Sequence, residues 1–146
     1  MAKPALRLLA EDADDLAVIA AACQDGVVRV ADVAWDQARR RFSLVMARFR
    51  WEAAGKRGPF ERIRAALSFE SVLRVRAKRL RTDNQDAVAA VLTITFEPAA
   101  EAPAGTVRIT LAGGGEFALD VECLDAALLD VGPAWPTPNR PDHDRS

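Results

Sequence analysis

The sequence of 146 residues contains no tyrosine and a single histidine, His143, close to its C-terminal end. Histidine is the commonest general base in enzymes and the commonest protein ligand of metal ions. Its absence from residues 1–142 excludes Ser–His–Asp and Cys–His nucleophile systems and histidine-based zinc sites. We therefore expect a protein that is not an enzyme and holds no metal or cofactor. An enzyme that uses carboxylates and arginines alone is the less favoured alternative.

Cysteines and long apolar runs are also scarce. Cys23 and Cys123 stand far apart without a CxxC pair, which is typical of small buried side chains, although the sequence alone also permits a disulfide between them. The longest nearly apolar run, 87–96, is about half the ~20 residues of a membrane-spanning helix. Residues 1–15 lack the apolar region and cleavage site of a signal peptide. These absences predict a cytoplasmic protein that does not enter a membrane.

Charge is present in quantity and is unevenly distributed. Residues 39–81, which we call the basic segment, carry fourteen basic and three acidic side chains, a net charge of +11. Residues 1–38 carry three basic and seven acidic side chains, and residues 82–146 carry three basic and eleven acidic ones. The whole chain has a net charge of only -1. Such segregation indicates a surface for an acidic or phosphate-bearing partner.

One amphipathic helix is predicted over residues 11–26. Its first turn is acidic, which suits the positive end of a helix dipole, and Asp12 is placed to cap it. Leu16, Ile19 and Cys23 follow at helical spacing, and Gly26 is placed to end the helix.

The rest of the chain has mainly the two-residue period of strands. Strands are expected at 5–10, 27–35, 41–51, 67–80, 88–98, 106–111 and 116–123. A bulge near Met46 or Ala47 would keep both halves of the third strand facing the core. The fold class is thus α+β: a curved, mostly antiparallel sheet or partly closed barrel of about seven strands, with one N-terminal helix. Residues 124–131 have helical spacing and are a candidate for a short C-terminal helix.

Residues 1–131 are expected to form one domain, followed by a proline-rich tail, 132–146, that is extended or disordered. The tail contains Trp135. This indole would either dock in a surface groove or act as a short linear motif for another protein.

Carboxylates alternate along the last predicted strand at Glu116, Asp120 and Glu122. Paired carboxylates serve acid–base chemistry when burial separates their pKa values, and carboxylates also bind Mg²⁺ or Ca²⁺. Three acidic residues at this spacing more often form the solvent-exposed face of a strand.

The stretch SFESVLRVRAKRLR, residues 68–81, places Arg74, Arg76 and Lys78 on alternate positions. They have three interpretations. They form a solvated strand face balanced by the acidic strand, they contact an acidic partner or a second copy of the chain, or they contact a nucleic-acid backbone beside stacking aromatics.

We expect an adaptor or regulatory module that binds a protein partner through the basic segment. RNA or single-stranded DNA binding through the same surface is the alternative. The residues expected at this surface are Arg48, Arg50, Arg74, Arg76 and Lys78 as contacts to carboxylate or phosphate, with Trp51 as an apolar anchor.

Three motifs carry a resemblance to a known family. They are Asp15-Leu16 with Gln24-Asp25 in the helix, Arg41-Phe42 with Arg48-Phe49-Arg50-Trp51-Glu52, and the triple-glycine hairpin that leads to Asp120-Val121-Glu122. In these the chain resembles the domain of unknown function 2948, a small bacterial family typical of alphaproteobacteria. The resemblance covers nearly the whole chain except the tail. The resemblance implies a single cytoplasmic domain. It supplies no catalytic residue, cofactor or binding site that could be carried over to this chain.

Overall fold

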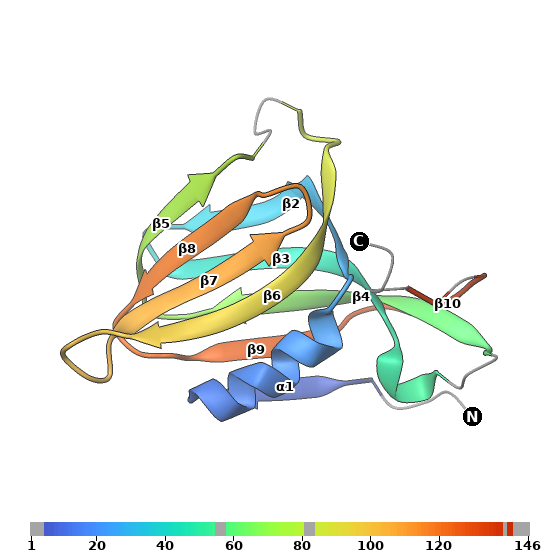
Figure 1. Ribbon diagram of the computed structural model, residues 1–146, viewed down its shortest axis with the longest axis horizontal. Helices are drawn as coiled ribbons and strands as arrows, with labels where there is room; N and C mark the ends of the chain where they lie inside the picture. Colours follow the sequence, from blue (N-terminus) through green and yellow to red (C-terminus); the bar gives the residue numbers. More distant parts are fainter. Residues whose placement is uncertain (1–4, 55–57, 81–83, 139, 142–146) are drawn as a thin grey trace.

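The structure is a computed structural model, and it describes residues 5–54, 58–80, 84–138 and 140–141 (Figure 1). Over these residues the chain forms one α-helix, one short 3-10 helix and ten strands. Their bounds are β1 Arg7–Ala10, α1 Ala13–Cys23, β2 Val27–Asp36, β3 Arg41–Phe49, η1 Trp51–Ala53, β4 Phe60–Phe69, β5 Val72–Lys78, β6 Val88–Pro98, β7 Gly105–Leu111, β8 Glu116–Val121, β9 Ala126–Asp130 and β10 Trp135–Thr137.

All strand pairs are antiparallel, in the order β1-β9-β4-β3-β2-β6-β7-β8-β5, with β10 attached to β4. The sheet folds over on itself at β2, which pairs with β3 along one part of its length and with β6 along another. One layer therefore contains β6, β7, β8 and β5, and the other contains β2, β3, β4, β9 and β1 (Figure 1). The sheet is not closed, because β5 and β1 remain at its two ends.

Helix α1 packs against β1 and β6 and so covers one open side between the two layers (Figure 1). Asp12 caps it as predicted, since its carboxylate accepts a 2.8 Å hydrogen bond from the backbone N–H of Asp15. Leu16, Ile19 and Cys23 are buried, which confirms the predicted apolar face. No helix in the described part of the chain has both the length and the apolar character to cross a bilayer.

The core lies between the two layers. Phe42, Leu44 and Met46 point into it from β3, and Ile109 and Leu119 point into it from β7 and β8. Phe42 contacts Phe117 of β8 with ring centroids 5.2 Å apart. Burial of such aromatic and aliphatic side chains is the main force that holds the layers together.

Ten strands are present where about seven were expected. The three additional strands arise because the expected strand 67–80 is two strands, β4 and β5, because residues 126–130 form β9 in place of the candidate C-terminal helix, and because the tail forms β10. In β9, Ala126 and Leu128 alternate into the core between β1 and β4. Sheet pairing on both sides overrides the helical spacing of this short run.

The proline-rich tail supplies the tenth strand. Trp135–Thr137 pairs with residues 60–62 of β4, and Trp135 is 37% exposed. The tail is expected to be extended or disordered, and these three residues are extended as a strand that pairs with β4. His143 lies outside the described residues.

Two further details of the strand predictions are wrong. The expected strand 67–80 is broken at Ser71, whose φ of 57° lies in the left-handed region, so that β4 ends and β5 begins there. The expected bulge in β3 is absent, since β3 pairs with β4 in continuous register, and the irregularity lies instead in β2 between Val28 and Val33. Consequently Arg48 shares the inward parity of Phe42, Leu44 and Met46.

Candidate functional site

Arg48 is the most deeply buried charged residue in the described chain, with a side chain that is 0% exposed. Its guanidinium donates to both oxygens of Asp130 at 2.7 and 2.8 Å, and to both oxygens of Glu52 at 2.9 and 2.7 Å. Asp130 also accepts a 2.9 Å hydrogen bond from the backbone N–H of Leu6. Arg48 therefore links β3 to β9 and to η1 inside the fold. Its side chain is not exposed for contact with a partner.

This cluster changes the ionisation of its neighbours. Burial acts to lower the pKa of Arg48, but its bonds to Glu52 and Asp130 outweigh burial and raise that pKa. The same Arg48 bond lowers the pKa of Glu52. Burial raises the pKa of the nearby Cys23 thiol to about 12, so this thiol stays protonated at neutral pH. Both cysteines are free, and Cys123 is partly exposed.

Arg50 is also buried, with 6% of its surface exposed. It donates to Glu61 at 3.0 Å, and its Nε lies 3.7 Å from Glu52, too far for a hydrogen bond. Arg50 thus belongs to the same internal network of charges as Arg48.

Trp51 opens η1 and points back at the end of the helix. Its indole Nε1–H donates a 3.0 Å hydrogen bond to the backbone carbonyl of Gln24, just past α1. Its ring meets Phe49 edge to face at 4.5 Å. Since helix C-terminal carbonyls have no partner inside the helix, Trp51 satisfies a group that would otherwise be open. The guanidinium of Arg62 donates a 3.3 Å hydrogen bond to the next backbone carbonyl, that of Asp25.

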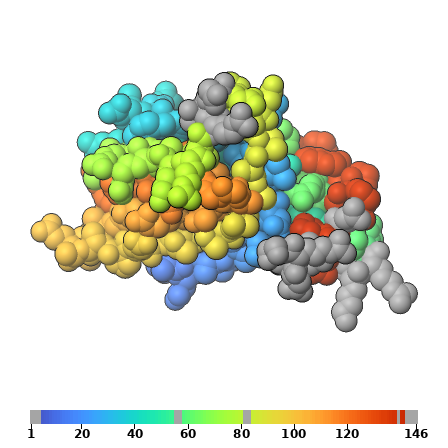
Figure 2. Space-filling view, turned by 45° about the horizontal axis from the view of Figure 1, so that its top comes forward, coloured from blue at the N-terminus to red at the C-terminus, as the bar shows by residue number. Residues whose placement is uncertain are grey.

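The other predicted residues, Arg74, Arg76 and Lys78, lie on β5 and are exposed; we call them the β5 cations. Figure 2 shows β5, in yellow-green, at the surface beside β8, in orange. In the β5–β8 register Arg74 faces Asp120 and Lys78 faces Glu116. The predicted pairing of a basic strand with the acidic strand is present, which gives part of this surface an internal explanation.

The pairing leaves a surplus of positive charge. Asp120 is shared, since it accepts from Arg76 at 2.7 Å and lies 3.8 Å from Arg74. Glu116 is already bonded to Arg108 of β7 at 3.2 Å, and no ion pair of Lys78 is found among the described residues. Three cations on β5 therefore share about one available carboxylate.

The structure does not bring the six predicted residues together. Arg48, Arg50 and Trp51 lie at the η1 end of the domain and the β5 cations lie at the other end (Figure 1). Lys56, Arg57 and Arg81, which belong to the basic segment, lie outside the described residues. The partner that sequence reasoning missed is Asp130. Its signal was the alternation of Ala126, Leu128 and Asp130, which places a carboxylate on the inward side of a strand.

The sequence makes Glu116, Asp120 and Glu122 candidates for acid–base chemistry or metal binding. In the part of the chain that the structure describes, no three metal-ligating side chains of His, Cys, Asp or Glu converge. Glu116, Asp120 and Glu122 are each engaged by an arginine at the surface, with Arg40 bonded to Glu122 at 2.6 Å.

The chain matches the model of the family described as a protein of unknown function (DUF2948) over residues 6–143, and it belongs to that family. No curated protein and no solved structure matches it.

Proposed function

We propose that the chain is a non-enzymatic adaptor or regulatory module that binds an acidic, extended segment of a protein partner along β5. The observation that carries the proposal is the surplus of positive charge on this edge strand, where the β5 cations outnumber the carboxylates available to them. Complementary charge selects and orients such a partner more than it tightens binding.

The position of β5 in the sheet adds a second argument. Within the described ranges β5 pairs with β8 alone, so backbone groups along its other edge are open to a further strand. The open stretch begins after Val72, whose N–H already donates to the carbonyl of Arg40 at 2.9 Å. Leu73, 48% exposed, offers an apolar contact at the start of this stretch.

The proposal rests on Arg74, Arg76 and Lys78 and no longer on Arg48, Arg50 or Trp51. The buried guanidinium of Arg48 already donates to two carboxylates and has no free donor to offer a partner. Arg50 is buried and donates to Glu61, and the Trp51 indole donates to the carbonyl of Gln24.

Binding of single-stranded nucleic acid is less favoured, because stacking aromatics are missing where the cations lie. Phe49 is buried, and Trp51 packs on Phe49 and has the guanidinium of Arg140 5.4 Å from its ring centre. A base would find no aromatic platform beside the β5 cations in the described part of the surface.

The test compares two fluorescent probes at low and physiological salt: a peptide of alternating glutamate and valine, and an oligothymidine of similar charge. One variant changes Arg74, Arg76 and Lys78 to Glu. A matched control changes Arg7, Arg39 and Arg64 to Glu, which are exposed residues on the other layer or its loops. We expect the peptide to bind, and binding to be lost in the β5 variant and kept in the control.

Equal loss in both variants would show an unspecific response to net charge and would overturn the proposal. Tighter binding of the oligothymidine than of the peptide, lost in the β5 variant alone, would replace the proposal with the nucleic-acid alternative.

A further inference from the structure

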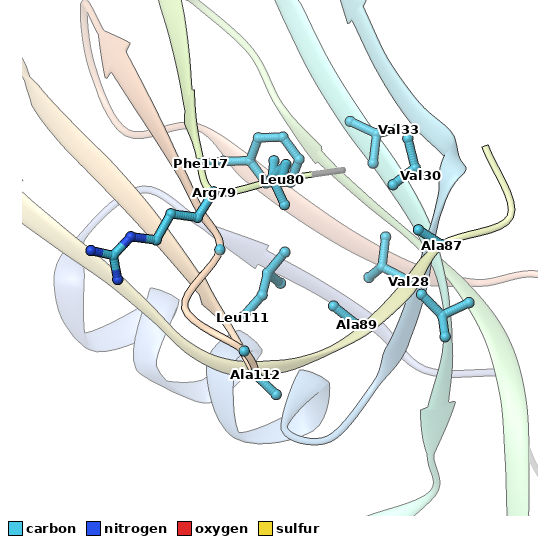
Figure 3. A pocket seen from close by; sticks show the side chains of 13 residues that line it. Val28, Val30, Val33, Arg79, Leu80, Ala87, Ala89, Leu111, Ala112 and Phe117 are labelled. Atoms are coloured by element: carbon cyan, nitrogen blue, oxygen red, sulfur yellow. The ribbon is translucent and has the colours of Figure 1, made fainter. Parts of the chain in front are cut away.

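A second site lies near the end of β5, on the side of the fold that α1 does not cover. A cavity of about 200 Å³ opens between β2 and the hairpin that joins β7 to β8 (Figure 3). Its walls are apolar, with side chains contributed by Val28, Val30, Val33, Leu80, Leu111 and Phe117. Among the residues that the structure describes, Arg79 is the only charged one that lines it.

The irregular register of β2 helps to form this cavity. The shift between Val28 and Val33 leaves the intervening residues of β2 unpaired with β3, and Val30 and Val33 line the same hollow. On the opposite wall, Leu80 packs closely over Gly115, where a Cβ would approach Leu80 Cδ2 to 2.8 Å. The glycine therefore makes room for one of the apolar walls.

The rim carries an uncompensated positive charge. Arg79 is exposed, and no hydrogen bond or ion pair of its guanidinium is found within the described chain. Figure 3 shows its aliphatic stem beside Leu80 and its guanidinium directed outward, away from the apolar side chains. No carboxylate occurs among the lining residues within the described ranges 58–80 and 84–138. The site thus combines an apolar interior with a cation at the water boundary.

We propose that this cavity binds a small monoanionic amphiphile, a carboxylate whose apolar chain enters the cavity while its head group stays at the rim beside Arg79. An apolar protein cavity of ~150 Å³ is large enough for benzene, so about eight carbons fit here. Drug-sized ligands need ~300 Å³ or more and are too large. The proposal goes beyond the binding of an acidic segment at β5 and does not depend on it.

The probes are octanoate and octan-1-ol, titrated into the full chain and followed by two-dimensional amide NMR. We expect octanoate to shift the signals of Val30, Leu111 and Phe117, and to bind more tightly than octan-1-ol. Arg79→Gln weakens octanoate about threefold to fivefold, the range of an exposed ion pair, and leaves octan-1-ol unchanged. The control Arg7→Gln, on β1, changes neither.

Two filling variants test the cavity itself. Ala89→Leu and Ala87→Leu each add three carbons to a different place on its wall, and we expect both to abolish the binding of octanoate. Their folding is checked by the amide spectrum, and either folded variant suffices.

Equal affinity for octanoate and octan-1-ol, unchanged by Arg79→Gln, would overturn the anionic part of the proposal. Shifts confined to residues outside the cavity, or octanoate binding that survives filling, would overturn the site. The peptide assay on β5 gives its result independently of these outcomes.

Discussion

Arg48 and Asp130 are 82 residues apart in the chain, yet they form a two-pronged ion pair with hydrogen bonds of 2.7 and 2.8 Å, and both side chains are fully shielded from solvent. The pair connects β3 to β9 across β4, which lies between them in the sheet. Glu52 closes the arrangement from η1.

Removing one member of this pair is expected to destabilise the fold strongly. Arg48→Met leaves the carboxylate of Asp130 buried without its cation, and we expect a loss of about 3–5 kcal/mol in the free energy of unfolding. We expect the double variant Arg48→Met/Asp130→Leu to lose less free energy of unfolding than Arg48→Met alone, because no unpaired charge is left buried. Urea unfolding measures the free energy of unfolding of both variants.

As a control, Arg41→Met breaks the exposed pair with Glu70 and costs about 1 kcal/mol or less. Equal losses for Arg48→Met and Arg41→Met would contradict a structural role for the buried pair.

The lowered pKa of Glu52 predicts how stability depends on pH. Its pKa in the folded chain lies below the ordinary value near 4.5 that holds after unfolding, because Arg48 binds its ionised form. Glu52 therefore stabilises the fold above about pH 4.5, and this contribution is lost as pH falls through the folded pKa. We expect the stability difference between the parent chain and Glu52→Gln to shrink between pH 6 and pH 3, values chosen to bracket the ordinary carboxylate range. A difference independent of pH would show that Glu52 acts without its charge. The size of the effect is limited because the side chain is partly exposed.

The hydrogen bond from the Trp51 indole to the end of α1 is expected to stabilise the fold. Trp51→Phe keeps the contact with Phe49 but removes the bond to the Gln24 carbonyl, and we expect a loss of about 1 kcal/mol beyond that of a control. Trp35→Phe is the control, since Trp35 also packs against the core and makes no side-chain hydrogen bond in the described structure. Thermal unfolding of the two variants supplies the comparison. If they lose the same stability, the hydrogen bond contributes nothing.

The two thiols are expected to differ sharply in reactivity. Cys23 is buried and has a pKa of about 12, whereas Cys123 is partly exposed. A thiol-reactive dye should therefore label one site in the native chain at neutral pH and two sites in denaturant. Cys123→Ala should abolish native labelling. Fast native labelling of that variant would mean that the α1 face opens readily.

Local signals in the sequence were sufficient for α1 and for the hairpin of β7 and β8. The Asp12 cap, the spacing of Leu16, Ile19 and Cys23, and the alternation on both sides of the glycine run all act within a few residues. The structure confirms these elements because neighbours along the chain determine them.

The internal charge network depends on pairing between distant strands and could not be predicted in this way. Arg48 lies on the inward parity of β3, but only the register of β4 with β9 brings Asp130 to the same place. An arginine between apolar residues is ordinarily placed outside, so sequence reasoning moved Arg48 to the surface. The β5 cations are exposed as predicted, and their nearest carboxylate in the described structure, Asp120, also lies at the surface.

The pairing of β1 with β9 has a consequence for synthesis of the chain. Residues 7–10 find their strand partner only at residues 126–129, and Arg48 finds Asp130 82 residues further along the chain. During synthesis, β1 and the guanidinium of Arg48 therefore remain without these partners until most of the described polypeptide has been made. Contacts between residues so far apart in sequence form late and slow folding, and the apolar strands stay exposed for longer.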